Sequence, residues 1–235
     1  MKIDPFLRKL LAEFLGVTLF LTAIIGAVNG GLATKTAALA AVLALAVLVT
    51  GPISGGHLNP AVSIYFYSRK EISIKELLGY IVAQVLGGLF GAWIGLTIWN
   101  KAVVVTSGNA SAGAILGELF ATGGLVWLIG RLATTKNGHL IPAAVGLWVF
   151  AVASATPTGG QANPAVSIAL LLNGQGGAAT AQLILAQLAG MLIASVFITV
   201  FADKVAAKKA EAAAEAPKAV AKKAPAKKAA TTKKK

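Results

Sequence analysis

Two identical six-residue runs hold the side chains most able to do chemistry in this sequence. Asn59-Pro60-Ala61 opens the first run, and Asn163-Pro164-Ala165 opens the second, 104 residues later. Asparagine is a favoured N-cap residue and proline is favoured at the first helical position, so each run predicts a helix start. The side-chain amide of each asparagine can donate hydrogen bonds to an oxygen of a bound molecule. The runs therefore predict two polar helix starts that together bind a neutral molecule.

The sequence around these runs indicates an integral membrane protein. Residues 1–202 contain ten Lys and Arg and five Asp and Glu, separated by long uncharged runs of Ala, Leu, Val, Ile and Gly. About twenty apolar residues are enough to cross the hydrocarbon core of a bilayer as a helix. We expect an all-α fold with six crossings, at about residues 6–29, 35–54, 75–100, 110–133, 139–157 and 177–202.

The two segments that begin at the asparagines are too short to cross a bilayer. Residues 59–68 and 163–173 are apolar and follow Gly-rich stretches. At about 1.5 Å per residue, a helix of this length reaches only about half the bilayer thickness. Such helices are tolerated at membrane depth where they are buried in protein or line a water-filled cavity. We therefore expect two re-entrant half-helices beside the six crossings.

The two halves of the sequence, about residues 6–100 and 110–202, repeat each other. Glu13 and Glu118 occupy similar segments 105 residues apart, and Gln84 and Gln187 occupy another similar pair 103 residues apart. Each half has three crossings, an odd number, so the second half must insert upside down. An inverted 3+3 repeat brings equivalent features together near the midplane of the membrane. The half-helices are then expected to meet start to start, where their positive dipole ends repel cations.

Charge outside the crossings predicts the orientation of the chain. The connectors on one side carry most Lys and Arg, and the other side has only Lys35 and Lys101. This bias places both termini of a multi-pass protein in the cytoplasm, in a plasma or inner membrane. After the channel domain of residues 1–202, residues 203–235 contain eleven Lys and three acids. This composition predicts a disordered tail, which is either simply solvated or held by anionic lipid.

Four segments make the chain similar to the aquaporin, or major intrinsic protein, family over about residues 6–202. They are "AEFLG" from residue 12, "SGGHLNPAVSI" from residue 54, "AQVLGGLFGA" from residue 83, and the second Asn-Pro-Ala. The resemblance implies six helices with two half-helices around one narrow pore per subunit, usually in a homotetramer. It implies passive flow of water or small neutral solutes such as glycerol, urea or ammonia, with no enzyme activity and no cofactor.

The resemblance also suggests roles for three polar residues. Glu13 and Glu118 are expected to bind the backbone of the re-entrant loops, and the alternative is a proton site of a pump, since acids within a membrane are often functional. His57 is expected to line or brace the cytoplasmic vestibule. A metal site is not expected there, because no second ligand is near in the sequence.

Four positions of the family's selectivity filter can be located in the same way. The family usually has Arg after the second Asn-Pro-Ala, where this chain has Val166. The other three positions fall on Leu39, Val152 and Gly160, with Ala151 as the alternative to Val152 because the following loop is one residue short. None of these is aromatic, His or Arg, so we expect a wide filter of low polarity.

Two other classes of protein remain open. A secondary transporter can also be built on an inverted repeat, but it needs a coupling-ion site, for which the sequence offers no candidate. A non-conducting member of the same fold would use its surface for packing or adhesion.

Overall fold

The structure is a computed structural model, which describes residues 3–30, 35–100 and 108–202. Residues 1–201 form one compact unit, and the expected tail at 203–235 lies outside the described residues. Within these described ranges, six helical segments are long and apolar enough to cross a membrane, which confirms the predicted all-α fold. The elements are α1 (Pro5–Gly30), α2 (Lys35–Ser54), α3 (Pro60–Ser68), α4 (Ile74–Trp99), α5 (Ala112–Ala133), η1 (Gly138–Leu140), α6 (Ile141–Ala155), α7 (Pro164–Ala169), η2 (Leu170–Asn173) and α8 (Gly177–Val200).

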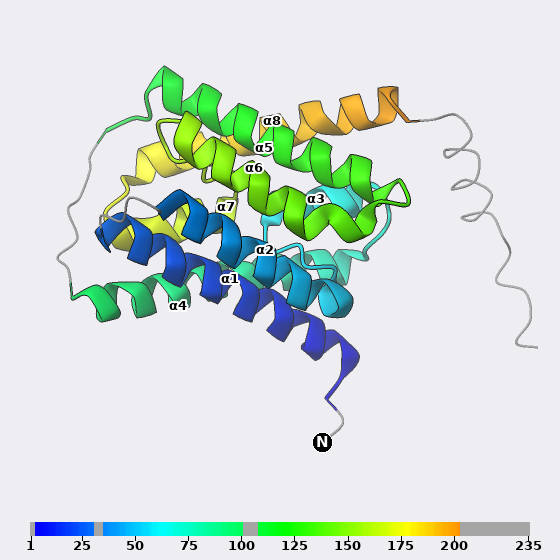
Figure 1. Ribbon diagram of the computed structural model, residues 1–235, viewed down its shortest axis with the longest axis horizontal. Coiled ribbons are helices and arrows are strands. Elements are labelled where there is room, and N and C mark those ends of the chain that lie inside the picture. The colour runs from blue at the N-terminus through cyan, green and yellow to red at the C-terminus, as the bar shows by residue number, and fades with distance from the viewer. Residues whose placement is uncertain (1–2, 31–34, 101–107, 203–235) are drawn as a thin grey trace, which may run out of the picture. The chain divides into compact units, whose positions relative to one another are not determined.

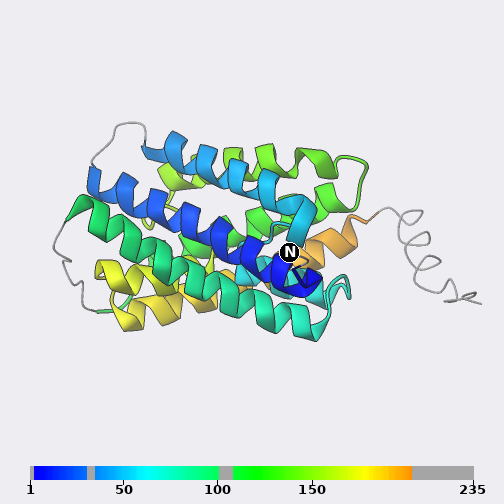
Figure 2. The ribbon, with the colours of Figure 1, turned by 90° about the horizontal axis from the view of Figure 1, so that it is seen from below.

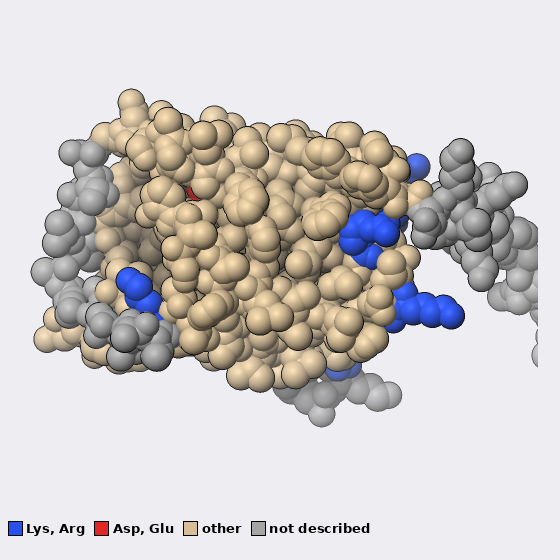
Figure 3. All heavy atoms as spheres, turned by 45° about the horizontal axis from the view of Figure 1, so that its top comes forward, with Lys and Arg blue, Asp and Glu red and all other residues tan. Residues whose placement is uncertain are grey.

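The two halves run in opposite directions, as an inverted repeat requires. The start of α1 meets the start of α4, where Lys9 Nζ lies 2.6 Å from Glu76 Oε1. The end of α5 meets the end of α8 at the same end of the bundle, because Arg131 donates to the carbonyl oxygen of Phe201 at 2.9 Å. We call this the basic end, and the opposite one the mouth end. Figure 3 shows Lys and Arg side chains gathered towards the basic end.

Glycines allow the long helices of each half to pack closely. At Gly87 of α4, a Cβ atom would collide with the backbone carbonyl of Phe14 in α1, and at Gly190 of α8 it would collide with that of Leu119 in α5. The Thr18 hydroxyl also donates across the first of these crossings to the carbonyl of Gly87, at 3.2 Å. Small residues and interhelical hydrogen bonds of this kind hold helices together where lipid removes the hydrophobic driving force.

The short helices α3 and α7 lie inside the bundle and tie the halves together (Figures 1 and 2). They contact each other, α3 also packs on α5 and α8 of the second half, and α7 packs on α4 of the first half. The second half-helix is shorter than the predicted 163–173, because the α-helix ends at Ala169 and continues as a 3-10 turn to Asn173. Each half-helix thus places its start in the middle of the molecule.

Candidate functional site

The two asparagine turns are joined by reciprocal hydrogen bonds. Each asparagine caps its half-helix, since Asn59 Oδ1 accepts from the Ala61 N–H at 2.9 Å and Asn163 Oδ1 accepts from that of Ala165 at 3.0 Å. Asn59 Nδ2 donates to the Ala162 carbonyl at 2.8 Å, and Asn163 Nδ2 donates to the Leu58 carbonyl at 2.9 Å.

A side-chain amide has two N–H groups, so these bonds use one N–H of each asparagine. No described residue accepts the other one. The crossing bonds fix both side chains and leave one N–H group of each without an acceptor among the described residues.

The residue before each asparagine has a strained backbone. Leu58 has φ 49° and Ala162 has φ 48°, in the left-handed region that residues other than glycine seldom adopt. Such a conformation costs about 1–2 kcal/mol per residue, and it persists only where the surroundings hold it. In this conformation the carbonyl of each residue points towards the opposite asparagine. Hydrogen bonds from the N–H groups of the same residues to buried carboxylates hold the conformation.

Glu13 holds the first loop with both of its carboxylate oxygens. Its side chain is fully buried. Oε1 accepts from the Ser54 hydroxyl and from the His57 N–H at 3.0 Å, and Oε2 accepts from the Leu58 N–H at 2.6 Å and from Gln84 Nε2 at 2.7 Å. Four donors thus satisfy the charge and fix the backbone of the loop.

Glu118 repeats this arrangement in the second half, and it is also fully buried. Oε1 accepts from the Thr158 hydroxyl and from the Gln161 N–H at 2.8 Å, and Oε2 accepts from the Ala162 N–H at 2.8 Å and from Gln187 Nε2 at 2.7 Å. Hydrogen bonds between charged and neutral groups contribute about 1.5–3 kcal/mol each. Both acids therefore have the contacts of structural groups.

His57 stands beside the first half-helix, within hydrogen-bond and ring contact of its neighbours. Its Nδ1 lies 3.1 Å from the Ser63 hydroxyl oxygen. Its ring stacks on Phe66, with centroids 4.6 Å apart, and meets the edge of Tyr80 at 5.2 Å. In the second half, Gln161 takes the equivalent place and accepts from the Ser167 hydroxyl at 2.6 Å. Within the described residues, no group of His, Asp and Glu has the arrangement of a metal site.

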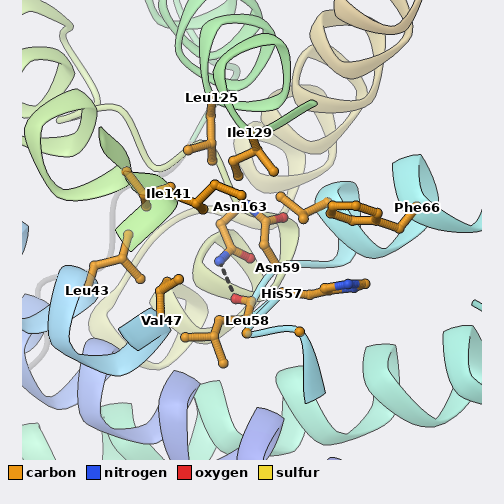
Figure 4. Close-up of a pocket in the computed structure, with 14 residues that line it drawn as sticks. Leu43, Val47, His57, Leu58, Asn59, Phe66, Leu125, Ile129, Ile141 and Asn163 are labelled. Carbon is orange, nitrogen blue, oxygen red and sulfur yellow. Dashed lines mark hydrogen bonds between the residues drawn. The ribbon is translucent and has the colours of Figure 1, made fainter. Parts of the chain in front are cut away.

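Both asparagines line one small cavity of about 50 Å³, which we call the NPA cavity. Figure 4 shows their side chains among apolar groups, with His57 and Phe66 on one side. A cavity of this volume has room for a few water molecules. Its apolar walls come from α2, α5 and α6, through Leu43, Val47, Leu125, Ile129, Ile141 and Val145. Apart from His57, the side chains around the two asparagines in the described lining offer no competing hydrogen bond.

A second, larger cavity of about 380 Å³ opens towards the mouth end, and we call it the mouth cavity. The same faces of α2 and α6 line both cavities, through residues spaced four apart along each helix: Lys35, Leu39, Leu43 and Val47 on α2, and Ile141, Val145, Val149 and Ala153 on α6. The cavities share no lining residue. The two cavities therefore follow each other along the same faces of α2 and α6.

Three of the four expected filter residues meet in the mouth cavity. Leu39, Gly160 and Val166 line it together, whereas Val152 does not. The Val152 side chain is 1% exposed, and it lies behind Gly160, where a Cβ atom would come within 2.6 Å of Val152 Cγ2. Ala151, the alternative, is exposed and is absent from the lining.

The lining of α6 at this level comes instead from Val149 and Ala153. Phe20 and Ile24 of α1 also line the mouth cavity, which the sequence analysis missed. Their spacing of four residues is the signal that they share a helix face. The mouth cavity therefore includes an aromatic side chain, although none of the four expected positions is aromatic.

Comparisons with known proteins agree with this architecture. The chain matches the family model described as major intrinsic protein over residues 1–169. It is 31% identical over 192 residues to Probable aquaporin PIP2-7 of Oryza sativa subsp. japonica, covering 68% of this chain and 66% of that protein. It is 31% identical over 175 residues to Aquaglyceroporin AqpS of Rhizobium meliloti (strain 1021), covering 69% and 74%.

Among solved structures, the aquaglyceroporin from Plasmodium falciparum aligns with a TM-score of 0.63 at 23% identity, covering 88% of this chain and 99% of that one. At this identity the match supports the fold alone. The family model, by contrast, covers most of the chain, including both asparagine turns. The chain therefore belongs to the major intrinsic protein family, whose members are channels and not enzymes.

Proposed function

We propose that the chain is a passive channel for water and for at least one other small neutral solute among glycerol, urea and ammonia. The observation that carries this proposal is the NPA cavity, where Asn59 and Asn163 present amide donors within apolar walls. A permeating oxygen atom can accept from both amides, and a water molecule bound in this way turns its hydrogens outwards. It then cannot relay a proton through the centre.

The half-helices supply the electrostatic barrier in this proposal. The starts of α3 and α7 meet at the cavity, and each helix start carries a partial positive charge. Cations are repelled there, while a neutral molecule with an acceptor atom is not. Such a barrier needs no moving part, whereas a secondary transporter needs alternating access.

The solute range in this proposal follows from the mouth cavity. Leu39, Ala153, Gly160 and Val166 bring no side-chain hydrogen-bond donor to the lining. The part of the lining that these four residues form discriminates weakly between solutes that differ in hydrogen bonding. One similar relative is named an aquaglyceroporin, so glycerol is the first larger solute to test.

Stopped-flow light scattering on proteoliposomes tests the proposal with water, glycerol and urea, and ammonia entry is followed with a pH-sensitive dye. We expect fast, non-saturating fluxes with a low activation energy. Val166→Arg should narrow the solute range, because it adds bulk, charge and donors at the mouth cavity. If the wild type passes water alone, the interpretation of the filter is wrong, and Phe20 becomes the candidate constriction. If it passes nothing, a structural or adhesive role is favoured.

The setting of the channel is also part of the proposal. The basic end faces the cytoplasm, because basic connectors are retained on that side, and the membrane is a plasma or inner membrane. The subunits form a homotetramer, which crosslinking in native membranes would test. The Lys-rich tail binds anionic lipid, since each Lys near such a surface contributes about 1 kcal/mol.

A further inference from the structure

Lys35 stands apart from the other described basic residues. It is the first residue of α2 and lines the mouth cavity, one helical turn from Leu39. The other seven described Lys and Arg lie at the basic end: Arg8, Lys9, Arg69, Lys70, Lys75, Arg131 and Lys136. In Figure 3, an isolated basic group lies beside a hollow, far from the other basic side chains.

Neither helix stability nor ion pairing explains this position. A cation at the start of a helix opposes the helix dipole, so it is unfavourable for α2 itself. The ion pairs of the described residues, Lys9–Glu76 and Arg69–Glu71, do not include Lys35. Membrane insertion also favours basic residues at the other end. Lys35 is an exposed residue that also lines the mouth cavity.

Nothing in the described lining of the mouth cavity balances this charge. Lys35 is the only charged residue among the lining residues described. Glu118 is the acid that binds the loop with the lining residues Thr158 and Gln161. However, its carboxylate is fully buried and faces four donors, two of them backbone N–H groups. Lys35 therefore gives the described lining of the mouth cavity a formal charge of +1.

We propose that Lys35 is a specificity-determining residue, a fixed positive charge at the entrance that repels cations before they reach the asparagines. Its role in permeation rests on the proposed channel function. The half-helix starts act at the centre, and Lys35 acts at the mouth, where Val166 supplies no charge.

The size of the effect follows from Coulomb's law. In water, a unit charge about 4–8 Å away changes the local concentration of a monovalent ion roughly two- to sixfold. The charge attracts an anion and repels a cation by the same factor. The ratio of their local concentrations therefore changes by the square of that factor, roughly five- to thirtyfold. The effect should largely vanish in about 1 M salt, where the screening length is about 3 Å. A purely structural role of Lys35 would show no such salt dependence.

The first experiment measures the potential at the mouth without requiring flux. The chain has no cysteine, so Ala153→Cys places a single thiol in the mouth cavity. Its modification rates by an anionic sulfonate reagent and a cationic trimethylammonium reagent, both methanethiosulfonates, are compared at about 10 mM and 1 M salt. We expect Lys35→Gln to lower the anion-to-cation rate ratio roughly five- to thirtyfold at low salt. Lys35→Arg and the matched control Lys136→Gln, at the basic end, should leave it unchanged.

The second experiment measures selectivity with guanidinium and urea, which are similar in size and shape and differ in charge. We expect Lys35→Gln to raise guanidinium permeability roughly two- to sixfold relative to urea, or relative to water if urea is excluded. An unchanged permeability ratio, including continued exclusion of guanidinium, overturns the selectivity role. If Lys35→Gln leaves the anion-to-cation ratio of thiol modification rates unchanged, the Lys35 charge does not act at the mouth cavity. A shifted thiol ratio in a protein that conducts nothing supports the charge and refutes the channel.

Discussion

Replacement of the buried Glu118 by glutamine tests whether this acid is structural. The carboxylate receives four hydrogen bonds, from Thr158, Gln161, Ala162 and Gln187. Glutamine has the same shape, but one oxygen becomes an NH2 group. Whichever way the amide turns, this group faces a backbone N–H, that of Gln161 or that of Ala162.

The expected cost can be worked from these contacts. One buried N–H without an acceptor costs about 1–3 kcal/mol, and each surviving bond loses about 1 kcal/mol when its acceptor is no longer charged. The variant no longer buries a charge, which offsets part of this loss. Gln187 can turn its own amide towards the new donor, but it cannot relieve the backbone N–H. We expect a net loss of about 3 kcal/mol.

Thermal unfolding in detergent, followed by tryptophan fluorescence at one scan rate, measures this loss. For a chain of this size, about 3 kcal/mol corresponds to a fall in apparent Tm of roughly 6–12 °C. The apparent Tm of Glu13→Gln should fall by a similar amount, because the four donors around Glu13 have the same arrangement. The control Glu71→Gln removes an exposed ion pair with Arg69 and should cost at most about 1 kcal/mol.

The outcome that contradicts this reasoning is specific. A proton site predicts that Glu118→Gln keeps the wild-type Tm and abolishes pH-driven transport. An unchanged Tm together with lost transport would show that Glu118 titrates in the mechanism, and that its hydrogen bonds to the loop are secondary.

Two further changes test the packing and the tail. Gly190→Ala should destabilise the protein by about 1–3 kcal/mol in the same unfolding assay, because its Cβ would collide with the carbonyl of Leu119; Gly51→Ala, where no atom lies within 4 Å of the added Cβ, should be neutral or slightly stabilising. Truncation after Ala202 should leave the water permeability per subunit unchanged, because the described cavity walls of both cavities lie before that residue; a large loss at equal protein content would show that the tail gates or assembles the pore.

Some features of the candidate site could be predicted because their signals are local. Asn-Pro starts a helix through its own cap and its fixed φ, so the half-helices at Asn59 and Asn163 were predictable. Buried acids are rare within a membrane, and the equal spacing of Glu13 and Glu118 identified them as a pair. The number of crossings followed from length and hydropathy alone.

The choice of lining residues could not be predicted in the same way. In a soluble helix, a polar face marks the side that meets water, but both the lipid-facing and the pore-facing sides of α2 and α6 are apolar here. The sequence therefore offered no signal to choose between Val152 and its neighbours Val149 and Ala153. In the structure Val152 packs behind Gly160, and Val149 and Ala153 line the cavity instead.

The sequence by itself determined the class of protein, the six crossings, the inverted repeat and the paired helix starts, because each depends on composition, caps or spacing along the chain. Only the tertiary structure decided that each asparagine binds the carbonyl before the other one, and that Lys35 joins Val166 at one cavity. These contacts join residues about a hundred positions apart across the interface of the two halves. Their geometry depends on how closely the glycine-lined helices approach and how the strained loops turn, which no local pattern encodes.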